Sequence, residues 1–202
     1  MHVKNILCTA LLFSGLVFAN GATAQNFKKE RNFLHNEYRQ VGGEAVFSGV
    51  PQWRQARYKS IMDKMAALPE ATRAGLLNEA DKAMAFTWPT LPATTYLQYR
   101  ENGNRINFEN IQFERRNVLV ALVAGELAGG NGKYLPQIVN GLWAILEEST
   151  WVIPAHVGAQ KAGSGLPDPA EPVIDLFAGE TSATLSWAQF LLHDELDRIS
   201  PM

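Results

Sequence analysis

Apolar residues recur at intervals of three and four along most of the chain after residue 50, which is the period of an amphipathic helix. Pro51 suits the first turn of a helix, and the pattern that follows it extends to residue 68. A second helical segment starts at Pro69 and continues to about residue 85. Pro89 and Pro92 prevent residues 86–95 from forming one regular element.

Four further helices are expected. They cover about residues 94–100, 108–127, 136–146 and 173–196. Asn102-Gly103 ends the first of them, and Gly129-Gly130 caps the second. No segment alternates with the period of a strand, so the sequence predicts an all-α fold of about six helices, in which short connections make neighbours antiparallel.

The last expected helix is apolar on nearly its whole circumference, and such a helix requires neighbours on every side. The sequence ends at Met202, a few residues beyond it. We therefore expect the chain to be the N-terminal part of a larger helical domain. We also expect isolated residues 25–202 to fold poorly or to self-associate through this helix.

The N-terminus has the three parts of a signal peptide. Lys4 is basic, residues 6–18 are apolar, and Ala22-Thr23-Ala24 supplies small residues for the peptidase. We predict cleavage after Ala24, which removes residues 1–24 and leads to export to the periplasm or cell surface. The alternative, a membrane anchor, needs about 20 apolar residues. Residues 25–50 are polar and mixed, and we interpret them as a lead-in to the helical region 51–202.

Composition narrows the functional class. The 202 residues are 47% hydrophobic and 19% charged, with a net charge of −2, so the basic surface of a nucleic-acid-binding protein is not indicated. Cys8 is the only cysteine. The mature chain therefore lacks disulfides and depends on packing, and after signal cleavage no membrane partner is expected. Oligomeric state is left open by the sequence.

The stretch AILEESTWVIPAH, residues 144–156, holds the candidate site residues. Glu147 and Glu148 stand at a helix C-terminus, where a carboxylate is unfavourable by about 0.3–1 kcal/mol. Trp151 and His156 follow on a proline-containing loop, and loops of this kind often carry binding residues. A tryptophan ring beside carboxylates and an imidazole suits a sugar, because the ring covers the apolar face while polar groups bind hydroxyls. We therefore predict that Glu148, Trp151 and His156 bind substrate, with Glu147 as the alternate carboxylate.

Each of these residues also has a structural interpretation. Successive helical residues point about 100° apart, so one glutamate can pair with Arg115 or Arg116 while the other is solvated. Trp151 alone is more typical of a core or interface, and His156 alone of a hydrogen-bonded structural histidine. Trp88 and Trp143 could extend the site, but we assign both to the core. His193-Asp194-Glu195 is interpreted as a polar helix end, and Asp175 as a residue at a helix N-terminus.

Several site types are not indicated. The chain lacks the nucleotide-binding glycine loops, the nucleophile elbow Gly-x-Ser-x-Gly and the zinc motif His-Glu-x-x-His. No metal and no cofactor is therefore predicted, and catalytic residues stay unassigned.

Taken together, NGLWAILEESTWVIPAH and LPDPAEPVIDLFAGETSATLSWAQFLLHDELDRISP resemble the N-terminal toroid region of bacterial heparinase II/III-like proteins. The stretches VPQWRQARYKSIM, WPTLPATTYLQYRENGNR and FERRNVLVALVAGELAGGNGKYL fit the same pattern, so the resemblance covers about residues 44–201. It implies a partial (α/α) toroid, whose remainder and β-sandwich domain follow residue 202. It also implies an exported polysaccharide lyase that cleaves uronic-acid-containing polysaccharide, heparin-like or related, by β-elimination.

The resemblance places the neutralising asparagine, the tyrosine and the β-domain histidine of such lyases beyond residue 202. The residues present would then form part of the groove wall, where His156 could polarise a uronate as imidazolium. Two alternatives stay open. One is a toroid glycoside hydrolase with two carboxylates facing one cavity, and the other is a non-catalytic helical protein that binds sugar.

Overall fold

The computed structural model describes residues 33–42 and 47–201. Contacts divide the chain into two units, Met1–Arg54 and Gln55–Met202, which are described separately. The signal peptide and its cleavage site lie outside the described residues. Over the described ranges all regular structure is helical and no strand occurs, so the prediction of an all-α fold is confirmed. None of the helices described is long and apolar enough to cross a membrane.

The first unit contains helix α2, Phe33–Val41. It lies within the segment that we interpreted as a polar lead-in, so the sequence missed it. Tyr38 contacts Phe47 with ring centroids 6.0 Å apart, yet Tyr38 and Val41 are both exposed. Its apolar positions do recur with the helical period, so the signal for this helix was present in the sequence.

Helix α4, Val50–Ala66, carries the boundary between the units and has no fully buried residue. The second unit continues with α5, Glu70–Ala83, after Pro69, and with α6, Ala93–Asn102, after Pro92. Gly103 ends α6 in the left-handed conformation, with φ at 79°, which glycine adopts without steric cost. These boundaries agree with the proline and glycine signals of the sequence.

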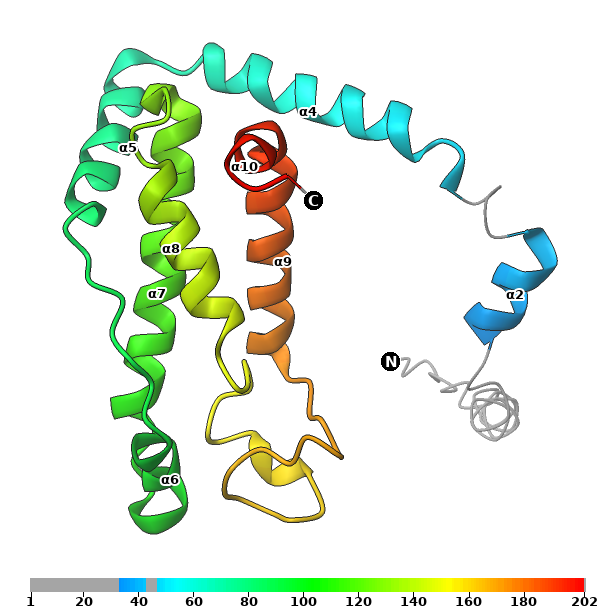
Figure 1. Ribbon diagram of the computed structural model, residues 1–202, viewed down its shortest axis with the longest axis vertical. Coiled ribbons are helices and arrows are strands. Elements are labelled where there is room, and N and C mark those ends of the chain that lie inside the picture. The colour runs from blue at the N-terminus through cyan, green and yellow to red at the C-terminus, as the bar shows by residue number, and fades with distance from the viewer. Residues whose placement is uncertain (1–32, 43–46, 202) are drawn as a thin grey trace, which may run out of the picture. The chain divides into compact units, whose positions relative to one another are not determined.

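Helix α7, Ile106–Gly125, lies at the centre of the second unit and packs against α5, α6, α8 and α9. It continues as a π-helical turn, η1, Glu126–Gly130, and the chain leaves it at Gly129 with φ at 131°. Helix α8, Leu135–Leu146, follows with Pro136 in its first turn. Figure 1 shows α7, α8 and α9 running alternately up and down, as expected for neighbours joined in sequence.

The last expected helix is two helices. Asp175 caps the N-terminus of α9, Leu176–Leu191, by accepting a hydrogen bond from the backbone N–H of Ala178 at 2.7 Å. The chain turns at Leu192 (φ −117°, ψ 22°) and continues as α10, His193–Ile199. The prediction of a single helix over 173–196 was therefore wrong. The bend contains no glycine or proline that could have marked it in the sequence, and the burial of Leu192 in the core sets it.

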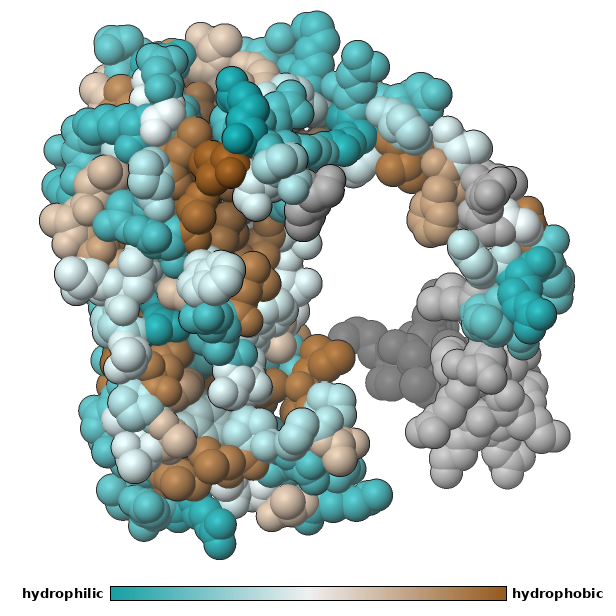
Figure 2. All heavy atoms as spheres, viewed as in Figure 1, coloured by the Kyte–Doolittle hydropathy of each residue, from teal (hydrophilic) through white to brown (hydrophobic). Residues whose placement is uncertain are grey.

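Two apolar clusters hold the second unit together. The larger one joins α5, α7, α8, α9 and Leu192 through Ala80, Leu119, Leu122, Ile138 and Ile145. The smaller one joins α6, the start of α7, the loop after α8 and α9 through Tyr96, Phe108, Val152, Val157 and Ala178. Apolar surface also stays uncovered. Leu146 and Leu176 are exposed, and brown patches lie over α8 and α9 in Figure 2.

Candidate functional site

A cavity of about 900 Å³ opens in the second unit beside α8, within the size range of small-molecule sites. Its walls are formed by α8, by the segment that leads into α6, and by the loop between α8 and α9. Polar side chains on its wall include Thr90, Arg115, Asn140, Glu147, Thr150 and Asp168, and apolar ones include Trp88, Leu91, Trp143, Val152 and Val173.

One face of α8 forms the longest polar and aromatic wall of this pocket. Asn140, Trp143, Ala144 and Glu147 all line it, and their spacing of three and four places them in one row. Trp143 is 66% exposed, so our assignment of Trp143 to the core was wrong. The spacing of these residues can be read from the sequence, but only the structure shows that a cavity lies beside them.

Trp88 forms a second aromatic wall and is held in place. Its indole N–H donates to the side-chain oxygen of Gln137 at 3.0 Å, and its ring meets Phe86 edge to face at 5.1 Å. Gln137 in turn donates to the carbonyls of Met84 and Phe86 at 3.0 Å. Trp88 thus packs against the core, as expected, and lines the pocket as well.

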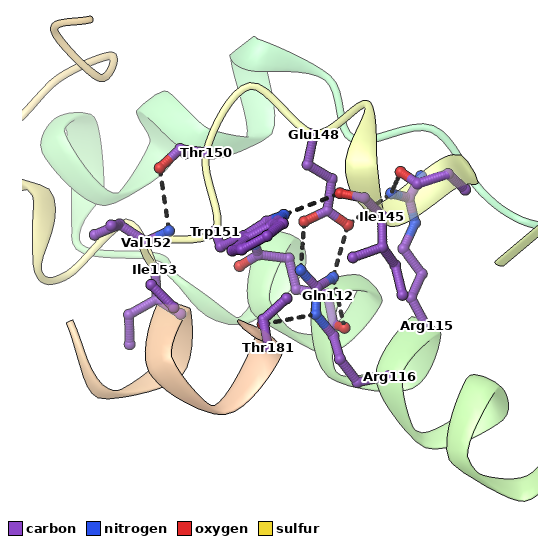
Figure 3. A network of polar contacts seen from close by, with 12 residues as sticks. Gln112, Arg115, Arg116, Ile145, Glu148, Thr150, Trp151, Val152, Ile153 and Thr181 are labelled. Carbon is purple, nitrogen blue, oxygen red and sulfur yellow. Dashed lines mark hydrogen bonds and ion pairs between the residues drawn. The ribbon is translucent and has the colours of Figure 1, made fainter. Parts of the chain in front are cut away.

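Glu148 is clamped by two arginines of α7, as Figure 3 shows. Arg116 donates from both terminal nitrogens to the two carboxylate oxygens at 2.6 Å, a bidentate geometry that is among the strongest ion pairs. Arg115 donates to the same carboxylate at 2.8 Å. The side chain of Glu148 is only 3% exposed, so its hydrogen-bonding capacity is used inside the protein.

The clamp explains how a carboxylate can stand at the C-terminus of α8. Arg115 also donates to the carbonyl of Ala144 at 3.0 Å, in the last turn of α8, and to the carbonyl of Pro89. Positive charge at this point offsets the negative end of the helix dipole. Arg115 therefore joins α7, α8 and the segment after Trp88, and it presents part of its side chain to the pocket.

Glu147 differs from its neighbour because its side chain is exposed and lies on the pocket wall. The structure thus contains both sequence alternatives at once, one glutamate paired with arginine and the other open to solvent. Asp168, on the loop between α8 and α9, brings a second carboxylate to the same pocket.

Trp151 and His156 do not line this pocket. Trp151 donates from its indole N–H to the carbonyl of Ile145 at 2.9 Å and packs against both apolar clusters. His156 lies on the short 3-10 turn that includes η2, Val157–Ala159, and pairs with Asp175. The structure therefore brings Glu147 and Glu148 together at the pocket, whereas Trp151 and His156 lie outside its lining.

Gln160 shapes the loop side of the pocket, and no pattern in the sequence indicated this role. Its side-chain amide donates to the carbonyls of Gly163 and Leu166, both at 2.9 Å. Its oxygen accepts from the backbone N–H of Asp168 at 2.8 Å. One buried amide thus folds a loop of nine residues and holds Asp168 at the pocket.

Two ionisable groups near the pocket floor have altered acidity. Burial raises the pKa of Tyr96, whose hydroxyl donates to the carbonyl of Val152 at 3.1 Å, and nearby Asp175 raises it further. Burial also raises the pKa of Glu109, although its ion pair with Arg105 at 2.9 Å opposes that change. The pKa of each group therefore lies above its usual value.

Gln112 lies one turn from Glu109 on α7 and is fully buried. Neither its amide nitrogen nor its oxygen has a hydrogen-bond partner among the described residues. Because an unsatisfied buried polar group costs about 1–3 kcal/mol, Gln112→Met should leave the free energy of unfolding unchanged or raise it by up to about 1 kcal/mol.

Gln137→Met is the matched comparison, since this amide makes four hydrogen bonds. It should lower the free energy of unfolding by about 1–3 kcal/mol. Urea denaturation followed by circular dichroism measures both variants. A larger loss in the free energy of unfolding for Gln112→Met than for Gln137→Met would contradict the absence of hydrogen-bond partners at the Gln112 amide.

No group of three or more histidine, cysteine, aspartate or glutamate side chains positioned for a metal ion occurs in the part of the chain that the structure describes. No protein-family model matches the chain, and no curated protein matches it in sequence. The resemblance to heparinase II/III-like proteins therefore stays a prediction from the sequence.

Proposed function

We propose that the chain is part of an exported carbohydrate-active protein, and that the pocket beside α8 binds one sugar unit of an acidic polysaccharide. The observation that carries the proposal is the exposed Trp143 on the wall of a pocket of about 900 Å³. Asn140, Glu147 and Thr150 line the same pocket and can bind the hydroxyls of a sugar whose apolar face lies on the ring.

The charges around the pocket indicate which unit it holds. Arg115 is the cation on the wall, and its charge is shared with Glu148, while Glu147 and Asp168 add negative charge. A uronate carboxylate would be repelled here. We therefore place a sugar unit that presents hydroxyls in this pocket and the uronate of the same chain outside it.

The proposed activity is lyase chemistry of the heparinase II/III-like kind, in a partial (α/α) toroid. The all-helical fold with alternating neighbours is compatible with such a toroid. In a lyase, β-elimination breaks the bond to the leaving oxygen and leaves an unsaturated uronate. We assign no residue of this chain to that step.

A glycoside hydrolase is the second candidate, and one observation favours it. Glu147 and Asp168 are two carboxylates on one cavity, as acid and base catalysis of hydrolysis requires. A non-catalytic sugar-binding protein is the third candidate. It needs the same pocket but no reacting groups.

Incubation of the chain with heparin, heparan sulfate and non-sulfated uronate oligosaccharides separates these candidates. We expect binding, measured by calorimetry and by tryptophan fluorescence. Products with the ultraviolet absorbance of unsaturated uronate identify a lyase, and saturated products with new reducing ends identify a hydrolase. Binding without products argues against the hydrolase, whose two carboxylates lie on this chain, and absence of binding to every uronate oligosaccharide overturns the proposal.

Trp143→Ala should weaken oligosaccharide binding by about tenfold or more, because truncating an aromatic anchor in a binding site costs about 1–2 kcal/mol or more. Trp187→Ala on α9 is the matched control, since this tryptophan is 45% exposed and does not line the pocket. Calorimetric titration measures both affinities. Equal losses of affinity in the two variants would show that stacking on the Trp143 ring does not contribute to sugar binding.

A further inference from the structure

A histidine and an aspartate form a fixed pair outside the pocket. The Nδ1 atom of His156 lies 2.8 Å from Oδ2 of Asp175. The aspartate side chain is 7% exposed and the histidine side chain 47% exposed. The pair therefore has a buried carboxylate on the inside and an imidazole at the surface.

The carboxylate of Asp175 is held by the backbone on both oxygens. Oδ1 accepts from the N–H of Ala178 at 2.7 Å, which caps α9, and Oδ2 accepts from the N–H of Ile153 at 3.3 Å. An anion fixed in this way accepts the third hydrogen bond from an imidazole N–H, so the proton of neutral His156 lies on Nδ1.

The ring of His156 is held from its backbone as well. The N–H of His156 donates to the carbonyl of Ile153 at 2.9 Å, and its own carbonyl accepts from Ala159 at 3.3 Å. Among the described residues no group hydrogen-bonds to Nε2. The lone pair of Nε2 is thus available at a half-exposed surface while the opposite ring nitrogen is anchored.

Two groups outside the pair interact electrostatically with it. Glu109 lies on α7 and Tyr96 on α6, and Arg105, which forms an ion pair with Glu109, stands at the N-terminus of α7. Glu109 lies close enough to His156 and Asp175 to interact electrostatically with both, and its buried Oε1 atom has no hydrogen-bond partner among the described residues.

We propose that His156 and Asp175 form a proton-transfer site at which Nε2 of His156 acts as general base toward a hydroxyl group or water molecule. Asp175 is the positioning residue. In the step, the O–H bond of the hydroxyl breaks, its electron pair stays on oxygen, and the proton forms an N–H bond at Nε2. Asp175 stabilises the imidazolium without itself taking the proton. This site is independent of the sugar that the pocket binds.

Hydrolysis of p-nitrophenyl acetate by the full chain tests the site without knowledge of its natural ligand. A water molecule loses a proton to Nε2 and bonds to the acetyl carbon, the bond to p-nitrophenolate breaks, and the proton on Nε2 returns to solvent. We expect faster release of p-nitrophenolate than the same concentration of free imidazole gives. The rate should rise with pH as His156 loses its proton.

The variants separate chemistry from folding. His156→Gln should remove most of the acceleration. Asp175→Asn should lower it by about tenfold or more, because asparagine still caps α9 but donates to Nδ1 and moves the ring proton to Nε2. Circular dichroism establishes that both variants are folded.

His193 provides the matched control. Its Nδ1 lies 3.0 Å from the half-exposed Asp197, but this nitrogen has no hydrogen-bond partner among the described residues. His193→Gln should therefore leave the rate unchanged. The proposal is overturned if the chain accelerates hydrolysis no more than free imidazole does. It is also overturned by equal losses of rate in His156→Gln and His193→Gln, or by a folded Asp175→Asn variant that keeps the full rate.

Discussion

Replacement of Glu148 by alanine is expected to lower the free energy of unfolding by about 3–5 kcal/mol. Among the described residues, Glu148 supplies the one carboxylate bound to Arg115 and Arg116, whose side chains are 7% and 8% exposed. Two positive charges would then lie close together in a dry interior without a counter-charge. Since whole domains are stable by about 5–15 kcal/mol, this loss would remove a large part of the total free energy of unfolding.

Glu147→Ala is the control for this experiment, because it removes the same type of side chain from the adjacent, exposed position. Its free energy of unfolding should stay within about 0.5 kcal/mol of the parent value. Urea denaturation monitored by circular dichroism and tryptophan fluorescence gives both numbers. Similar stability in the two variants would mean that the clamp does not hold the second unit together.

Glu147→Ala is also informative about function. It leaves the clamp intact but removes a carboxylate from the pocket wall. A stable Glu147→Ala variant with weaker oligosaccharide binding would separate the two glutamates into one that builds the pocket and one that contacts the ligand.

Gly125→Ala is expected to lower the free energy of unfolding by about 1–3 kcal/mol. A methyl group at this position would lie 2.2 Å from the Cβ atom of Ala80, where the backbones of α5 and α7 approach most closely. Neither group can rotate away, because each is fixed directly to a helix backbone. The gain in helix propensity, about 1 kcal/mol, does not compensate for separating the two helices.

Gly75→Ala on α5 provides the comparison, since a methyl group there meets no atom within 4 Å. It should raise the free energy of unfolding by about 0.5–1 kcal/mol, because alanine loses less conformational freedom than glycine in a helix. Thermal and urea unfolding of both variants should therefore shift in opposite directions. A stabilised Gly125→Ala variant would contradict the close packing of α5 on α7.

The all-α class and the ends of most helices followed from local signals. Pro69, Pro92 and Pro136 mark the starts of α5, α6 and α8, and Gly103 marks the end of α6. These residues act through their own φ angles, and the prolines also through the backbone N–H that they lack, so their effect does not depend on what the helix packs against. For the same reason the sequence alone suffices to place them.

The bend at Leu192 and the exposure of Trp143 depended on packing and could not be derived locally. Leu192 turns because its side chain fits the core formed with α7 and α8, and Trp143 is exposed because the pocket lies beside it. Hydrophobicity alone assigns both residues to the interior, although interior positions are set by contacts between segments far apart in sequence.

The sequence determined that Glu147 and Glu148 point in different directions and that one of them could pair with an arginine, because helix geometry fixes the angle between neighbours. Only the tertiary structure decided that Glu148 is the paired residue, and that Arg115 and Arg116 both take part. It also decided that His156 pairs with Asp175, 19 residues away. A long-range ion pair depends on the distance between two elements, and that distance is fixed only when the helices pack.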